Sequence, residues 1–256
     1  MSAGALLDEK KVESSCFAEG RSMKGRLRQL AWLTVLVAPL WASAASAVTY
    51  LHRNDIPSAR SVPLDKIDER YRELVRQVLD KPMLSGRGPS ETFNCRPEHY
   101  CWFLDHPDRA VVAWRRLGAK CVSINPRSDG KFSWADDTGS EVVWETVYKG
   151  PGVRVWFADG KVRPGPLLPL VPVKAVVVLR HKDSRAPDGA SVMQHQCDLF
   201  VHTDSKTAAM MTRMLGPTAN RVAEQGLGQL QLFFSGLSWY LDRHPEQAEA
   251  LLKIGD

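Results

Sequence analysis

The sequence predicts an α+β fold in which a curved antiparallel sheet wraps around a long C-terminal helix. Apolar side chains in residues 217–241 recur at helical spacing, and residues 121–203 contain about six segments of strand character separated by short turn sequences. Short connections favour antiparallel neighbours. The wide apolar face of the helix requires an apolar sheet to cover it.

Length and composition are those of an ordinary globular chain. The 256 residues are 44% hydrophobic and 25% charged, with a formal net charge of +5. The basic residues form no stripe interleaved with aromatic residues, so we expect no nucleic-acid partner. The sequence contains no GxSxG or CxxC motif and no phosphate-binding glycine loop. We therefore expect no metal and no cofactor, and we assign no catalytic residue.

An apolar segment near the N-terminus predicts that the chain is targeted to a membrane. Residues 30–51 are apolar or small, Arg21, Lys24, Arg26 and Arg28 lie just before them, and Ala45-Ser46-Ala47 matches a signal-peptidase site. Residues 30–51 are therefore either a signal peptide or a membrane anchor. Residues 1–29 are either a cytoplasmic tail or include a mis-assigned start, because a segment beginning at Met23 has the usual proportions of a signal.

In both cases, the basic residues stay on the cytoplasmic side and the rest of the chain lies outside the cytoplasm. It is then periplasmic or secreted if residues 30–51 are cleaved, and held at the membrane if they form an anchor. Four cysteines fall in this exported part: Cys95, Cys101, Cys121 and Cys197. They permit two disulfides in three pairings, or they are buried thiols, and the spacing does not choose between these alternatives.

The exported part begins with a linker and an amphipathic helix. Residues 52–62 are a polar linker. Residues 63–83 contain a helix that starts at Pro63 and ends near Asp80, with apolar positions three and four residues apart. This helix either packs on the domain that follows, residues 84–256, or forms a stalk.

Two short helices precede the sheet. Residues 90–95 are extended, and residues 97–104 and 107–117 form helices that each open with proline. Gly118 ends the second helix. The predicted strands are residues 121–125, 131–135, 141–149, 153–158, 173–182 and 192–203. Asp159-Gly160 is predicted as a turn, and the four prolines of residues 164–172 predict a loop.

Alternation along the strands predicts one covered face and one solvated face. Val142, Trp144, Thr146 and Tyr148 share a face, as do alternate residues from Val173 to His181 and from Met193 to Val201. Residues 205–215 form a short helix, and Gly216-Pro217 starts the long one. Its apolar face contains Val222, Ala223, Gly226, Leu227, Leu230, Phe233, Phe234, Leu237, Tyr240 and Leu241. Ser235 falls on its polar face, and Pro245 opens a final short turn of helix.

This order of elements resembles the helix-grip fold of the START-like, or SRPBCC, superfamily. The resemblance covers roughly residues 84–241. It rests on the element order and on PEHYCWFLDHPDRAVVAWRRLG, residues 97–118, which is similar to the helical pair of the family. The resemblance implies an apolar cavity between the sheet and the final helix, and it carries over no catalytic residue.

The residues expected to line this cavity lie on the covered strand faces and on the long helix. They are Trp144, Tyr148, Val177, Leu179, Met193, His195, Cys197, Leu230, Phe233, Phe234 and Leu237. Ligand pockets are mostly apolar with a few polar groups, and His195 or Tyr148 would orient the ligand. The alternative is that these side chains fill a core.

The function expected from these features is that of an exported or membrane-anchored START-like protein that binds a lipid or other apolar small molecule. A cyclase-like or hydrolase-like enzyme using the same cavity is an alternative, with His195 as its candidate base. A second alternative is an interaction module with a filled core. Leu232 and Trp239, seven residues apart on the polar side of the long helix, would then contact a partner or a membrane.

Overall fold

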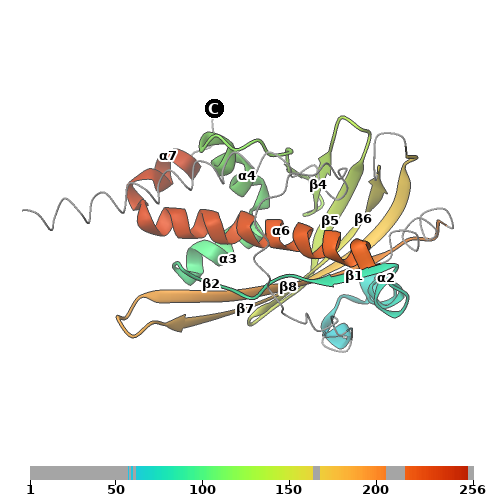
Figure 1. The fold of residues 1–256 in the computed structure, drawn as a ribbon, viewed down its shortest axis with the longest axis horizontal. Helices are drawn as coiled ribbons and strands as arrows, with labels where there is room; N and C mark the ends of the chain where they lie inside the picture. The colour runs from blue at the N-terminus through green and yellow to red at the C-terminus, as the bar shows by residue number, and fades with distance from the viewer. Residues whose placement is uncertain (1–56, 58, 60–61, 164–167, 206–216, 253–256) are drawn as a thin grey trace, which may run out of the picture.

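The computed structural model describes residues 57, 59, 62–163, 168–205 and 217–252. The predictions for residues 1–51, and for all but the first residue of the helix expected over residues 205–215, lie outside this range. The predicted α+β fold is confirmed, because an open eight-stranded antiparallel sheet carries a long C-terminal helix (Figure 1).

The described elements follow one another in the expected order, with a few differences in their bounds. In chain order they are η3 (Leu64–Lys66), α2 (Glu69–Asp80), β1 (Leu84–Arg87), β2 (Glu91–Asn94), α3 (Pro97–Asp105), α4 (Pro107–Arg116), β3 (Asn125–Pro126), β4 (Phe132–Ala135), β5 (Glu141–Gly150), β6 (Val153–Val162), β7 (Val171–Arg185), β8 (Ser191–His202), α6 (Pro217–Arg243), η4 (Pro245–Gln247) and α7 (Ala248–Leu252).

The sheet runs in the order β1-β8-β7-β6-β5-β4-β3, and β2 also pairs with β8. The strands β1 and β2 therefore share one neighbour. Residues Gly88, Pro89 and Ser90 interrupt the pairing with β8. Arg87, the last residue of β1, pairs with Asp198, and Glu91, the first residue of β2, pairs with His195. Consecutive strands from β4 to β8 are neighbours, as short connections require.

Each face of the sheet buries its own apolar cluster. The inner cluster joins β5–β8 to α3, α4, α6 and α7, and it includes Trp156, Leu179 and Leu237. The outer cluster joins the opposite face of the sheet to η3 and α2, and it includes Val75, Val178 and Phe200. The sheet is therefore covered on both sides, and the prediction of one solvated face is wrong where η3 and α2 pack on it.

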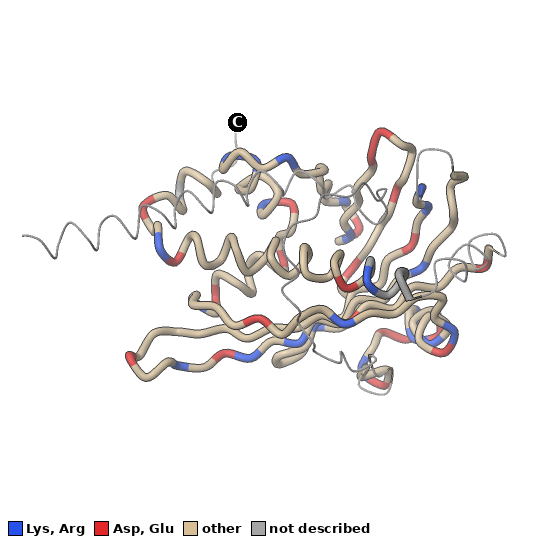
Figure 2. The backbone as a smooth tube through the Cα atoms, in the orientation of Figure 1, with Lys and Arg blue, Asp and Glu red and all other residues tan. Residues whose placement is uncertain are grey.

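The helix α6 packs against the strands at one side of the sheet and against the two short helices. It contacts β1, β2 and β8 as well as α3 and α4. The Nε1–H of Trp114 in α4 donates to the Phe233 carbonyl over 2.8 Å, and the rings of Trp156 and Phe234 stack with centroids 6.2 Å apart. Figure 2 shows that the middle of α6 carries no charged residue, as its packing on both sides requires.

Two predictions about the helices are corrected, and one alternative that the sequence left open is decided. The α-helix near the start of the domain begins at Glu69 and not at Pro63, because Leu64–Lys66 forms a separate 3-10 turn and the Asp68 carboxylate accepts from the Arg70 N–H as the N-cap. Of the two placements predicted for this helix, packing on the domain is the one observed. Ser235 is buried and not on a polar face.

Several strand predictions also differ from the structure. Residues 121–125 contain only the start of β3 at Asn125, and β1 was not predicted. Asp159-Gly160 lies inside β6 and is not a turn. Gly160 pairs with Val142, and a Cβ at Gly160 would overlap the Glu141 carbonyl, so the glycine marks a close approach of two strands.

Candidate functional site

Most of the residues predicted to line a cavity lie together on the inner face. Leu179, Met193, Cys197, Phe233, Phe234 and Leu237 belong to the inner cluster and are at most 5% exposed. Trp144, Val177 and Leu230 pack against the same cluster and are only half-buried. The predicted set therefore consists of a closely packed part and a more open part.

Tyr148 lies on the other face of the sheet. The pairing of β5 with β6 shifts between Thr146 and Tyr148, so that Tyr148 stands opposite Val155, a residue of the outer cluster. An extra residue in one strand reverses the faces of all residues that follow it. The predicted alternation over residues 141–149 is therefore wrong after Thr146, and Tyr148 packs with the outer cluster.

His195 lies at the centre of a buried polar chain beneath α3. Its Nδ1 is 2.6 Å from the Tyr100 hydroxyl, and its Nε2 is 3.0 Å from Oε2 of Glu91. A neutral His195 with its proton on Nε2 satisfies both contacts, since Nε2–H donates to the carboxylate and the tyrosine O–H donates to Nδ1. The Ser235 hydroxyl donates to the same Glu91 oxygen over 3.3 Å.

This polar chain is closed to large molecules. Tyr100 and His195 are at most 1% exposed, whereas the Glu91 side chain is 30% exposed. Burial raises the pKa of Tyr100 well above its ordinary value. The chain links a partly exposed carboxylate to a buried phenol.

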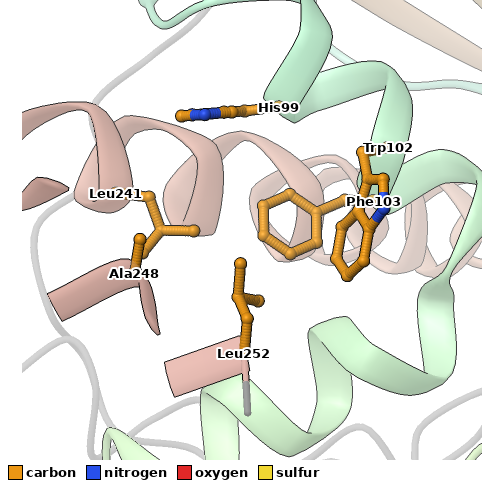
Figure 3. Close-up of a pocket in the computed structure, with 6 residues that line it drawn as sticks. All are labelled: His99, Trp102, Phe103, Leu241, Ala248 and Leu252. Atoms are coloured by element: carbon orange, nitrogen blue, oxygen red, sulfur yellow. The ribbon is translucent and has the colours of Figure 1, made fainter. Parts of the chain in front are cut away.

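A pocket lies beside this region, among the helices α3, α6 and α7. It has a volume of about 230 Å³ and lies between α3, the C-terminal end of α6, and α7 (Figure 3). Its lining residues are His99, Trp102, Phe103, Leu241, Ala248 and Leu252. Five of these six side chains are apolar or aromatic, and sequence reasoning identified none of the six as a site residue.

His99 is the polar residue of the pocket wall. Its Nδ1 is buried and has no hydrogen-bond partner. Burial, and secondarily the nearby Arg96 guanidinium, lower the pKa of His99, so that the imidazole is neutral at pH 7. The pocket is therefore an apolar hollow, partly open to solvent, in which almost no polar surface is exposed.

The two residues predicted as surface contacts differ in exposure. Leu232 is 42% exposed and is one of the most exposed large apolar side chains described. Trp239 is half-buried, and the Arg243 guanidinium lies over its ring at 5.0 Å from the centroid. Leu232 is therefore the more exposed of the two predicted contact residues.

The four described cysteines are free thiols. Cys95 and Cys197 are buried, whereas Cys101 and Cys121 are partly exposed. Burial raises the pKa of all four thiols, that of Cys95 to about 12, so they remain protonated at neutral pH. No group of three or more potential metal ligands occurs among the described residues. Within the same residues, no helix has the length and apolar character needed to span a bilayer.

Comparisons with known proteins give distant structural similarities. Neither the protein-family models nor the curated proteins contain a match to this chain. A conserved protein from Geobacillus kaustophilus is 17% identical with a TM-score of 0.38, over 59% of this chain and 95% of that one. The hypothetical protein jhp0584 from Helicobacter pylori is 10% identical with a TM-score of 0.35, over 61% of this chain and 86% of that one.

An uncharacterized protein from Rhizobium leguminosarum is 14% identical with a TM-score of 0.24, over 59% of this chain and 95% of that one. The names of these three proteins assign no activity. The compatibility of this chain with a helix-grip fold rests on its own sheet order and on the packing of α6.

Proposed function

We propose that this chain is a helix-grip protein of the START-like, SRPBCC superfamily and that it binds a small apolar molecule. The observation that carries the proposal is the apolar pocket of about 230 Å³ between α3, α6 and α7. Apolar contact area buried in such a pocket contributes roughly 25 cal/mol per Å² to affinity. The element order and the contacts of α6 with the sheet support the superfamily assignment.

The size of the pocket restricts the ligand. A cavity of about 150 Å³ lined by aliphatic and aromatic side chains is large enough for benzene, and drug-sized ligands occupy roughly 300–1,000 Å³. A volume of about 230 Å³ therefore suits one substituted ring or a short chain. A lipid would enter only by one end of an acyl chain.

The proposed site is displaced from the cavity expected between the sheet and the long helix. Phe233, Phe234 and Leu237 of α6 are in the tightly buried part of the inner cluster. The pocket begins one turn further along α6, at Leu241, where α7 packs against α4.

The binding proposal is tested by filling the pocket. In the full-length chain, Ala248→Phe places a ring into the pocket, whereas Ala250→Phe changes an exposed residue of the same helix. Binding of 4-fluorotoluene to the original chain and to the two variants is measured by ¹⁹F NMR in the same detergent. The probe then partitions equally into micelles in all three samples, so differences in signal report binding to the protein.

We expect saturable binding to the original chain and to Ala250→Phe, and its loss in Ala248→Phe. Equal signals from the two variants, or no saturable binding by the original chain, would refute the proposal.

We also propose that residues 48–256 act outside the cytoplasm. The apolar residues 30–51, the basic residues before them and the Ala45-Ser46-Ala47 sequence support this location. N-terminal sequencing of the protein purified from cells distinguishes the two forms. A mature chain beginning at Val48 indicates a cleaved signal, and an uncleaved chain whose domain is digested by protease added outside the cytoplasmic membrane indicates an anchor. A domain that remains protected from this protease contradicts both.

A second candidate function is that of an interaction module. The tight packing of the inner cluster and the 42% exposure of Leu232 favour it. Leu232→Lys would abolish capture of a partner without affecting binding of 4-fluorotoluene, and size-exclusion chromatography of cell extracts would detect the change as a smaller complex. An unchanged elution volume would argue against this candidate.

A further inference from the structure

We propose that two copies of this chain associate through the open edge of β7, where residues 182–186 of each copy form an antiparallel pair centred on Ser184. This interface is separate from the pocket and goes beyond the proposed function. Three observations lead to it: a strand edge without a neighbour, the direction of the backbone groups along that edge, and an order of charges that complements its own reverse.

The first observation is that the last part of β7 has a neighbouring strand on one side only. The pairing of β7 with β8 continues to Arg185, but its pairing with β6 ends at Arg180. Residues 182–185 are exposed, and Figure 1 shows the end of the β7–β8 hairpin projecting beyond β5 and β6. Within the described part of the chain, one edge of β7 is therefore open over these residues, and an open edge is a template for another strand.

The second observation is the direction of the backbone groups along this edge. The His181 N–H donates to the Gly152 carbonyl, just before β6, over 2.8 Å, whereas the Ala186 N–H donates on the β8 side. Alternate residues of an antiparallel strand direct their N–H and C=O groups to opposite sides. Asp183 and Arg185 therefore direct their backbone groups to the open edge, where a second strand would pair with them.

These directions restrict how two copies can pair. Within residues 182–186, a symmetric antiparallel pair that uses the edge-directed groups is centred on Asp183, Ser184 or Arg185. A centre at Asp183 or at Arg185 places that residue opposite its own copy, and like charges directly opposite one another are unfavourable. A centre at Ser184 places Asp183 of each copy opposite Arg185 of the other.

The third observation is that these two charges are available on the same face of the strand. Asp183 stands opposite Met193 of the inner cluster, and Arg185 is two residues further along, so both side chains lie on the inner face. The ion pairs of the described residues include neither Asp183 nor Arg185. The Arg185 guanidinium donates to the Gly189 carbonyl over 3.4 Å, near the limit of a hydrogen bond. Each Asp183 would therefore gain an ion pair in the dimer.

Charged side chains on an edge strand commonly prevent pairing with other chains. Here the charges match in the register centred on Ser184 and repel in the two adjacent registers, so they favour a second copy over an arbitrary strand. The paired segment is short, and its buried area would fall below the roughly 1,200 Å² of stable complexes. We therefore expect a weak, reversible dimer, and a two-fold pair closes on itself without forming a larger assembly.

The pairing is tested by disulfide trapping in the full-length chain. In the proposed register the two Ser184 residues form a non-hydrogen-bonded pair with Cα atoms about 4.5 Å apart, within the reach of a disulfide. Ser184→Cys should therefore give a cross-linked dimer on mild oxidation, seen at twice the mass on a non-reducing gel. The matched control is Asp188→Cys at the exposed hairpin tip, roughly 25 Å from its counterpart. It should give no more dimer than the original chain, which reports the background from the native thiols.

The order of charges is tested in the Ser184→Cys chain. Asp183→Arg and Arg185→Asp each place like charges opposite one another at two positions of the dimer. We expect each of them to lower the rate of cross-linking about tenfold. The chain with both substitutions restores opposite charges and should cross-link as fast as Ser184→Cys alone. Circular dichroism checks that all variants keep the fold.

Several outcomes overturn the inference. Ser184→Cys could stay monomeric, because another segment covers the edge or because nothing pairs there, or it could cross-link no faster than Asp188→Cys. Equal cross-linking by the single and double charge variants would show that the charges do not set the register. None of these outcomes affects the proposed binding function, since the pocket is formed by α3, α6 and α7 and the edge by β7.

Discussion

At the scale of single residues, Asp105 joins the last turn of α3 to two strands of the sheet. Its carboxylate accepts from Lys149 over 2.7 Å and from Arg154, which is only 3% exposed. Burial by itself would raise the pKa of Asp105, but the hydrogen bonds from Arg154 and Lys149 outweigh it and lower the pKa below its ordinary value. The ionised Asp105 carboxylate therefore stabilises the folded state at pH values above the ordinary aspartate pKa of about 3.9. This stabilisation is lost as the pH falls through the lower pKa of Asp105 in the folded state.

We expect Asp105→Asn to lower the free energy of unfolding by about 2 kcal/mol at pH 7, as for hydrogen bonds to charged groups. The difference from the original chain should shrink as the pH falls below about 4. Urea unfolding at pH 7, 5 and 3 measures it. Asp137→Asn, at an exposed turn position, should change stability by less than about 0.5 kcal/mol. A difference between the original chain and Asp105→Asn that is independent of pH would contradict this account.

Gln231 completes the hydrogen bonding at the break between β1 and β2. Its side-chain oxygen accepts from the Cys197 N–H over 3.3 Å, and its amide nitrogen donates to the Pro89 carbonyl over 2.7 Å. Gln231→Leu would leave the buried Cys197 N–H unpaired and would remove the hydrogen bond to the carbonyl of the exposed Pro89, at a cost of about 1–3 kcal/mol. Chemical denaturation measures the loss, and Gln225→Leu, an exposed position of α6, should be nearly neutral.

Gly88 provides an independent check on Gln231, because a Cβ at Gly88 would overlap the Gln231 side-chain oxygen. Gly88→Ala should therefore destabilise the chain, and the double variant with Gln231→Leu should be less destabilised than the sum of the two single variants. Strictly additive effects would mean that Gln231 and Gly88 act separately.

At the scale of elements, the docking of α2 on the outer face depends on apolar burial and on one buried carboxylate. Glu145 of β5 is 8% exposed, and it accepts from the Tyr71 hydroxyl and from the Arg70 guanidinium over 3.2 Å. Burial, and then the hydrogen bond to Glu145, raise the pKa of Tyr71, so it is a phenol at pH 7. This contact links α2 to β5 on the outer face of the sheet.

A double-mutant cycle with Tyr71→Phe and Glu145→Gln measures this contact. We expect a coupling energy of about 1 kcal/mol in urea unfolding at pH 7. The exposed Arg76–Glu73 pair of the same helix is the control, and its cycle should give about 0.3 kcal/mol. Similar coupling in the two cycles would mean that Tyr71 and Glu145 are no better linked than a surface pair.

The elements differ in how far local sequence determines them. Pro97 and Pro107 open α3 and α4 as predicted, and Gly118 follows α4 with a φ of 88°, because these residues constrain the backbone themselves. Gly160 was misinterpreted because a glycine required by a neighbouring strand resembles one required by a turn. The strand β1 was missed because Leu84–Arg87 has no alternation, and its strand conformation comes from pairing with β8.

At the scale of the whole molecule, the residues of the inner face were predictable, whereas the covering of the outer face and the pocket were not. Alternation along β7 and β8 placed Leu179, Met193 and Cys197 correctly on the inner face, because the period of a strand is local information. The prediction that Tyr148 lies on the inner face was wrong because a bulge has no clear signature in the sequence. The pocket arises where three helices meet, and the unpaired nitrogen of His99 becomes visible only when its surroundings are known.

The two apolar clusters share one sheet, so we expect the described part of the chain to unfold as one cooperative unit. Leu237 of the inner cluster and Val178 of the outer cluster are both 0% exposed, and they lie on opposite sides of β7 and β8. Leu237→Ala should lower the free energy of unfolding by about 2–5 kcal/mol, and Val178→Ala by about 2 kcal/mol. In both variants, tryptophan fluorescence and far-UV circular dichroism should report the same urea midpoint. If Val178→Ala produces an early transition that releases the outer face alone, the layer formed by α2 and η3 is a separate unit, and the sheet does not couple its two faces.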